Sequence, residues 1–134
     1  KYKGKQKKHK TSKPHKFLSS DGTTILIGKN NVQNDQLTLK TAKKSDIWLH
    51  AKNIPGSHVI IESNHPSEET LFEAASLAAY YSKFQNSSNV PVDYVAVKNI
   101  RKPNGAKPGF VIYEGQKTLY VTPDKELVRT LKAD

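Results

Sequence analysis

The sequence predicts an α+β fold, with a largely antiparallel sheet packed on one long Ala-rich helix at about 68–84 and a short C-terminal helix. Three observations favour this fold class. The chain has 134 residues, enough for one domain with one core. Short alternating apolar runs lie on both sides of a single Ala-rich stretch. Strands, then one helix, then strands is an order typical of α+β proteins.

The first expected element is a hairpin. Asp21 and Gly22 separate two short apolar runs, residues 17–19 and 24–28, and Asp-Gly is a common turn between paired strands. The amides and carboxylate of residues 30–35 then predict a loop, because Asn and Asp satisfy their own turns.

Two half-buried strands are expected next. Apolar and polar residues alternate over 37–40 and again over 46–51, which is the period of a strand with one buried face. The turn Pro55-Gly56 leads to the apolar run 59–61, which we expect to pair with the strand at 46–51.

The long helix has a clear start signal. Ser67 is a favoured N-cap, and Glu68 and Glu69 place acids in the first turn, where they suit the helix dipole. The segment is apolar nearly all round from 71 to 84, which predicts a helix buried against the sheet.

The C-terminal part predicts more strands and a last helix. Residues 92–100 read as a strand, and residues 110–113 are expected to pair with 118–121 across Gly115-Gln116. Thr122-Pro123 opens the short terminal helix. Its apolar side would carry Leu127, Val128 and Leu131.

The charge is strongly uneven. The chain has 22 Lys and Arg against 12 Asp and Glu, a net charge of +10, which favours polyanionic partners. Eight Lys and no acid lie in residues 1–17, so residues 1–16 are expected to be a basic flexible arm and 17–134 the folded domain. The folded part would then carry only a small positive excess.

Composition excludes several classes of protein. There is no Cys, so no disulfide framework, thiolate nucleophile or Cys-bearing zinc site is possible. No apolar run reaches the roughly 20 residues of a membrane span, and neither a signal peptide nor membrane insertion is expected. The chain has no Met, even at residue 1, so we expect a fragment of a longer protein. No cofactor and no metal are expected.

The densest group of functional side chains lies at 46–58. On a strand, Asp46, Trp48 and His50 would share one face, and the turn could bring Ser57 and His58 beside them. Four interpretations stay open: a Ser-His-Asp hydrolase, a metal site, a local scaffold with Trp48 in the core, and a surface that stacks a base. In the last of these, Lys52 would meet a phosphate.

Two further segments are candidates for binding phosphate groups. Residues 98–109 combine four cations with Pro, Asn and Gly, which suits a shaped loop on a nucleic-acid backbone, although an exposed basic loop is the simple alternative. The four cations are Lys98, Arg101, Lys102 and Lys107. The Gly28-Lys29-Asn30-Asn31 stretch offers amide donors, with Lys29 and Asn31 as the candidates.

These segments together resemble one known family. They are Asp21-Gly22, Gly28-Lys29-Asn30-Asn31, Gln33-Asn34-Asp35, Asp46-Ile47-Trp48-Leu49-His50-Ala51, Pro55-Gly56-Ser57-His58-Val59, Lys102-Pro103 and Gly105-Ala106-Lys107-Pro108-Gly109. In the same order, over about residues 14–123, they resemble the NFACT-R domain. This is the C-terminal RNA-binding module of the family of bacterial RqcH, fibronectin-binding protein FbpA, nuclear export mediator factor and Caliban.

The resemblance implies a binding module rather than an enzyme. Family members bind the large ribosomal subunit (rRNA) and tRNA in ribosome-associated quality control, and the bacterial branch adds C-terminal alanine tails to stalled chains. The resemblance places the domain after a coiled-coil arm, in a cytoplasmic, ribosome-associated protein. Some Gram-positive relatives are described as cell-surface adhesins for fibronectin or fibrinogen, which is the alternative function. The family's tRNA-recruiting Asp-Arg motif belongs to another domain, so this chain is expected to bind without elongating.

Overall fold

The computed structural model describes residues 12–134 and contains a six-stranded antiparallel sheet of order β1-β2-β4-β3-β5-β8. Its strands are β1 (His15–Leu18), β2 (Thr24–Ile27), β3 (Ile47–Ala51), β4 (Val59–Ile61), β5 (Val90–Ala96) and β8 (Lys117–Val121). A separate pair consists of β6 (Ile100–Arg101) and β7 (Ile112–Tyr113), and the α-helices are α1 (Asn31–Gln36), α2 (Glu68–Tyr80) and α3 (Lys125–Leu131). The predicted α+β class, the Asp21-Gly22 hairpin and the pairing of β3 with β4 are confirmed.

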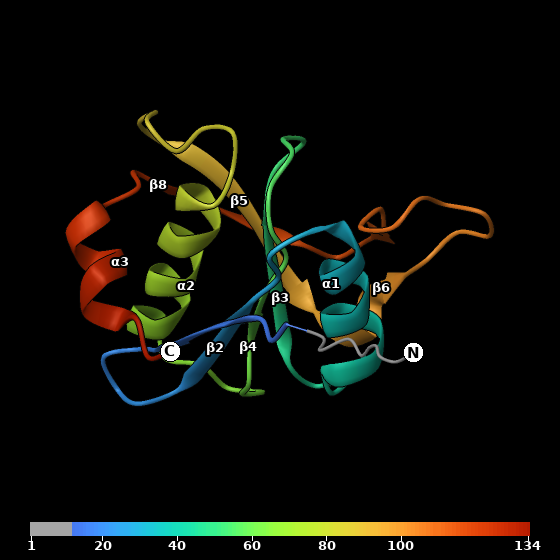
Figure 1. Ribbon diagram of the computed structural model, residues 1–134, viewed down its shortest axis with the longest axis horizontal. Coiled ribbons are helices and arrows are strands. Elements are labelled where there is room, and N and C mark those ends of the chain that lie inside the picture. Colours follow the sequence, from blue (N-terminus) through green and yellow to red (C-terminus); the bar gives the residue numbers. More distant parts are fainter. Residues whose placement is uncertain (1–11) are drawn as a thin grey trace, which may run out of the picture.

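The sheet is covered on both faces. Helices α2 and α3 lie on one face, whereas α1 and the β6 region lie on the other (Figure 1). Two separate apolar clusters result, one under α2 and one around Trp48. Strand β4 is central and buried at every position, which explains its unbroken apolar run.

Helix α2 anchors the larger core. The Ser67 hydroxyl accepts a hydrogen bond from the Thr70 amide, as expected for an N-cap. Its alanines are fully buried because their small side chains let the helix lie close to the sheet. The helix ends at Tyr80 rather than at 84, since Ser82 Oγ donates to the Ala79 carbonyl and turns the chain toward Gly56.

The predicted loop at 30–35 and strand at 37–40 are wrong. Asn30 caps α1 by accepting from the Gln33 amide, and the helix continues into a π-helical turn over Leu37–Thr41. Leu37 is buried in the second core while Leu39 is 38% exposed. The short apolar–polar alternation over 37–40 is compatible with a helix or a strand. The structure is helical there, and Leu37 packs in the same apolar cluster as Trp48.

The predicted hairpin of 110–113 with 118–121 is also wrong. Strand β7 pairs with β6, whereas β8 pairs with β5, with Leu119 opposite Val92. The predicted strand at 92–100 ends at Ala96, and a 3₁₀ turn at Val97–Asn99 leads into β6. The Gly115 turn therefore connects two different sheets instead of closing one hairpin.

The two ends of the domain meet. The Ala133 amide donates to the Lys16 carbonyl at 2.9 Å, and the Lys16 amide donates to Asp134 Oδ2 at 3.1 Å. The last helix α3 follows Asp124, its N-cap, and buries Val128 and Leu131 as predicted. Of the arm expected at 1–16, residues 1–11 lie outside the described residues. Its last two residues, His15 and Lys16, belong to β1.

Candidate functional site

Backbone hydrogen bonds join two segments of the folded domain that carry exposed cations, residues 43–46 and residues 97–101. The Lys98 amide donates to the Lys44 carbonyl at 3.0 Å, and the Val97 amide donates to the Asp46 carbonyl at 2.9 Å. Both lysine side chains are exposed. We call the exposed cations of this region the basic edge; they are Lys43, Lys44, Lys98 and Arg101. The edge concentrates positive charge that the sequence divides between distant segments.

The structure does not assemble a Ser-His-Asp triad. Asp46 is buried and its Oδ2 accepts from the Lys43 amide at 2.9 Å, while His50 Nδ1 lies 2.6 Å from the Ala51 carbonyl. Because a carbonyl only accepts, that nitrogen carries the proton. No hydrogen bond within residues 12–134 links Asp46, His50 and Ser57 side chains. Asp46 and His50 therefore fix local backbone, as in the scaffold interpretation.

Trp48 lies in the second core. Its side chain is only 1% exposed, and its ring stacks on His50 at 5.6 Å with an interplanar angle of 6°. Tyr113 and His58 pack at 4.6 and 5.4 Å. The indole Nε1–H has no hydrogen-bond partner in the part of the chain that the structure describes. A base stacked over the Trp48 ring face would therefore have to displace these neighbours.

His58 is a buried junction. Its Nε2 lies 3.0 Å from the Gly109 carbonyl and its Nδ1 lies 2.7 Å from Thr38 Oγ1. Nε2 must donate to the carbonyl, so in the neutral ring Nδ1 accepts from the threonine hydroxyl. Burial and the nearby His50 lower the pKa of His58 to about 4, and burial also lowers the pKa of His50. The His58 ring is therefore uncharged at neutral pH, and burial favours the neutral form of His50 as well.

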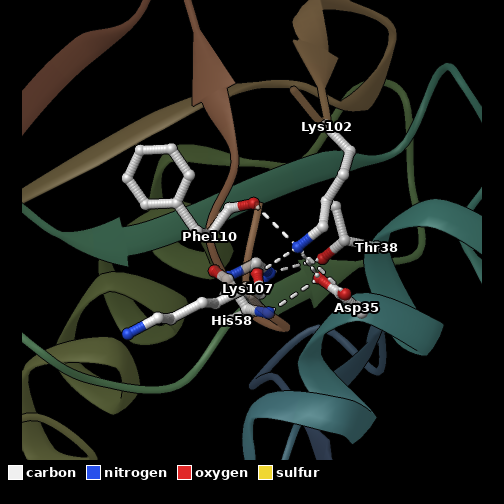
Figure 2. A network of polar contacts seen from close by, with 7 residues as sticks. Asp35, Thr38, His58, Lys102, Lys107 and Phe110 are labelled. Atoms are coloured by element: carbon white, nitrogen blue, oxygen red, sulfur yellow. Dashed lines mark hydrogen bonds and ion pairs between the residues drawn. The ribbon is translucent and has the colours of Figure 1, made fainter. Parts of the chain in front are cut away.

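The Lys102 ammonium lies in an internal network of hydrogen bonds and is not free in solvent. Its Nζ donates to Asp35, at 3.1 Å from Oδ2, and to the Phe110 carbonyl at 3.1 Å, with the Lys107 carbonyl also in contact. Asp35 Oδ1 in turn accepts from the Gly109 amide at 2.8 Å. Figure 2 shows these groups converging from α1 and the 102–110 loop. The network holds this Pro- and Gly-containing loop against α1.

Residues of the Gly28–Asp35 stretch also hold neighbouring segments in place, namely the start of β4 and the 102–110 loop. Asn34 Oδ1 accepts from the His58 amide at 3.1 Å, and Gly28 leaves room for it, since a Cβ there would collide with that carboxamide. Gly109 has φ +87°, and a Cβ there would lie 2.8 Å from Asn31 Oδ1. Asn31 thus packs on the loop, whereas Lys29 is exposed at the start of α1.

Lys52 is likewise paired. Its Nζ lies 2.9 Å from Asp93 Oδ1, and Asp93 also accepts from Tyr113 and Thr118 hydroxyls at 2.8 Å each. Burial tends to raise the pKa of Asp93, but the hydrogen bonds from Lys52, Tyr113 and Thr118 outweigh it and lower that pKa. Asp93 is 1% exposed, and this pair connects the residue that follows β3 to the middle of β5.

Among the predicted site residues, exposure separates two groups. Lys29, Lys98, Arg101 and Lys107 are exposed cations, and Asn31 is exposed beside the loop. Trp48, His50, His58, Lys52, Lys102 and Asp46 make internal contacts, and Ser57 is half-buried with its amide on the Tyr81 carbonyl. The network partners Asp35, Thr38 and Asp93 were not predicted as site residues, although Asp35 lies in one of the segments that carry the family resemblance. Asn30 at a cap position, which would have revealed α1, was the one available signal for the first two.

A cavity of about 220 Å³ lies where these elements meet. It is lined by Trp48, His50, Asn53, His58, Gly109, Phe110, Val111 and Tyr113. Within residues 12–134, no cluster of three or more His, Cys, Asp or Glu side chains could hold a metal ion. Over the same range, the helices are too short or too polar to cross a bilayer.

The family model for the NFACT protein RNA-binding domain matches residues 13–119. The chain belongs to this family. Its basic edge, the His58 junction and the Lys102 network all lie within the matched residues.

Curated relatives agree with the match. The chain is 54% identical over 132 residues to the Rqc2 homolog RqcH of Bacillus subtilis, covering 95% of this chain and 23% of the relative. It is 54% identical over 130 residues to the corresponding protein of Streptococcus suis, covering 96% and 24%. Ribosome quality control complex subunit 2 of Schizosaccharomyces pombe is 34% identical over 80 residues, covering 57% and 8%. The chain thus spans about a quarter of the bacterial relatives it matches.

A solved structure has the same fold. The C-terminal part of the fibronectin/fibrinogen-binding protein from Streptococcus suis superposes with a TM-score of 0.92 at 53% identity, covering 96% of this chain and 53% of that chain. This NFACT RNA-binding domain is therefore of the type found in RqcH/Rqc2 ribosome quality control factors.

Proposed function

We propose that this NFACT domain helps hold a ribosome quality control factor on the large ribosomal subunit and its tRNA. The whole protein would use that attachment to add C-terminal alanine tails to stalled chains, in the cytoplasm. The observation that carries the proposal is the Lys98–Lys44 backbone contact, which brings two basic segments into one exposed edge. Exposed cations suit phosphate groups, and contacts to phosphates carry no sequence information.

The proposed role is binding without catalysis. The side chains of Asp46 and His50, two of the three candidate triad residues, hydrogen-bond to backbone groups, and the network around His58 and Lys102 holds a loop in place. The RNA phosphates would meet the four cations of the basic edge, together with Lys29 and Lys107. Lys52 and Lys102 would contribute by holding the scaffold, because their ammonium groups already pair with Asp93 and Asp35.

The basic arm of residues 1–16 is a second part of the proposal. It carries most of the chain's net charge and would attract any polyanion without selecting among them. Selectivity for ribosomal RNA or tRNA would then depend on the folded domain.

The test compares two double variants with equal charge change. Lys44→Gln with Lys98→Gln removes two cations from the basic edge, and Lys125→Gln with Arg129→Gln removes two from α3, on the other sheet face. Binding of tRNA and of large subunits is measured against salt concentration. The first variant should flatten the slope of log K against log salt by about 1.5, at roughly 0.7–0.9 per lost phosphate contact. Equal effects of both variants, or no RNA binding at low salt, would count against the proposal.

A second candidate function rests on the solved relative, whose name describes it as a fibronectin/fibrinogen-binding protein. Binding of this chain to immobilised fibronectin that persists in excess tRNA would support an adhesin role. Binding that tRNA abolishes would mean only that the basic surface attracts acidic proteins.

A further inference from the structure

The aromatic cavity at the end of β3 has the size and lining of a small planar ligand site. Its volume of about 220 Å³ is below the range of roughly 300–1,000 Å³ that drug-sized ligands occupy. Five of its eight lining residues carry aromatic rings. We call them the aromatic cavity residues; they are Trp48, His50, His58, Phe110 and Tyr113. A space this small and this aromatic fits one heteroaromatic ring system better than a whole nucleotide.

Phe110 is the unusual member of this group. Its side chain is 55% exposed and belongs to neither apolar core. The residue before it, Gly109, is held by hydrogen bonds to Asp35 and His58. Figure 2 shows its ring extending away from the Lys102 network, while its carbonyl faces the Lys102 ammonium. An exposed ring at the wall of an aromatic cavity is a surface on which a base can stack.

The position of Phe110 is fixed in advance. Asp35 holds the Gly109 amide at 2.8 Å, His58 holds the Gly109 carbonyl at 3.0 Å, and Lys102 holds the Phe110 carbonyl at 3.1 Å. Three anchors on two consecutive residues remove most of the freedom of a loop that contains Pro and Gly. A ligand meeting this loop would therefore pay little ordering entropy.

Polar groups at the cavity could read the edge of a base. Asn53 is exposed, has φ +55°, and presents a carboxamide with both donors and acceptors. The indole Nε1–H of Trp48 lacks a partner within residues 12–134. Lys107 is exposed on the same loop, and its side chain also extends away from the network (Figure 2). A base in the cavity would have its flanking phosphate within reach of a basic loop.

We propose that this aromatic cavity receives one unpaired nucleobase of the bound RNA, with Phe110 as its outer stacking wall. The inference rests on the proposed RNA-binding function and adds to it a requirement for single-stranded bases. Paired bases in a duplex keep their faces stacked on each other, so RNA loops and ends would be the preferred substrates.

Trp48 provides a direct signal, because it is the only tryptophan of the chain and lines the cavity. The full chain is titrated with single-stranded octaadenylate and octauridylate, with an RNA duplex of equal length, and with heparin as a polyanion that has no bases. Binding is followed by anisotropy and by Trp48 emission. Single strands should change the emission, whereas heparin should bind and leave it unchanged. Equal emission changes with heparin would overturn the proposal.

Variants of Phe110 then separate stacking from general affinity. Phe110→Ala should weaken single-strand binding by about 5-fold to 150-fold, the range for loss of one stacked base, while heparin binding stays unchanged. Phe110→Trp should retain single-strand affinity. The control is Phe72→Ala, because Phe72 is 52% exposed on α2, on the opposite sheet face. Thermal unfolding checks that each variant folds.

The results also distinguish this inference from the proposed function. If wild-type chain binds tRNA with a steep salt dependence and Phe110→Ala binds single strands equally well, only the cavity proposal fails. If no RNA binds at low salt, both fail. If Phe110→Ala loses fibronectin but not RNA, the cavity belongs to a protein ligand and the proposal is overturned.

Discussion

His58 donates from Nε2 to the carbonyl of Gly109, 51 residues further along the chain, at 3.0 Å. Its Nδ1 lies 2.7 Å from Thr38 Oγ1, so one imidazole ties the start of β4, the π-helical turn and the 102–110 loop. The ring is 1% exposed. Protein stability and the position of the loop should therefore both depend on this one side chain.

Acid should destabilise the domain through His58. Its folded pKa of about 4 lies below the ordinary value of 6.5, so between these pH values the unfolded chain binds a proton that the folded chain does not. The free energy of unfolding should fall by about 2 kcal/mol as pH drops from 7.5 to 5, because the unfolded chain takes up this proton in that range while the folded chain takes up little of it. Urea unfolding at pH 7.5 and pH 5 measures it. His58→Gln should lose less between these two pH values than wild type; an equal loss would assign the effect to His50 or other groups.

Lys102 and Lys107 should behave differently although they are five residues apart. Lys102→Met removes the ammonium that bonds to Asp35 and to two carbonyls, so we expect a loss of about 2 kcal/mol in unfolding free energy. Lys107→Met removes an exposed charge and should change stability by less than about 0.5 kcal/mol, while weakening RNA binding. Urea unfolding and tRNA titration test both. Equal stability of the two variants would contradict the internal role of Lys102.

Gly28 and Asn34 should be energetically coupled. Gly28→Ala forces a Cβ into the Asn34 carboxamide, which accepts from the His58 amide, so a loss of about 1–3 kcal/mol is expected. Asn34→Ala removes the obstacle together with the hydrogen bond. The double variant should therefore be less destabilised than the sum of the single variants, as a double-mutant cycle measures. Additive effects would show that the close approach is relieved elsewhere.

Removing residues 1–11 should separate affinity from folding. The deletion takes away six Lys but none of the described fold, so the thermal unfolding midpoint should stay the same. Affinity for tRNA should fall and its salt dependence should flatten. Comparing tRNA with heparin checks whether the N-terminal segment supplies general attraction and the folded domain supplies selectivity. If so, the shortened chain should lose more heparin binding than tRNA binding. Equal losses would assign no selectivity to the folded domain.

Elements with strong local signals were predicted correctly. The Asp21-Gly22 hairpin, strand β3 and the Ser67 cap of α2 each combine a turn or cap residue with the matching apolar period. The alternation at 46–51 also placed Trp48 and His50 on one face of the strand, where their rings stack. Here local chemistry and tertiary packing agree.

Long-range pairing was not predictable in the same way. Nothing near Gly115 reveals that β8 prefers the edge of β5 over β7, because that choice depends on the whole sheet. The same holds for the candidate site. Lys102 looks like its neighbour Lys107 in the sequence, and only Asp35, 67 residues away, makes it an internal group. Sequence alone gives residue types but not which cations are already neutralised.

The contact between Ala133 and Lys16 means that the domain enters and leaves through one point. Labels attached at Lys16 and Ala133 would therefore lie side by side, and a distance measured between them would report directly on whether β1 is docked.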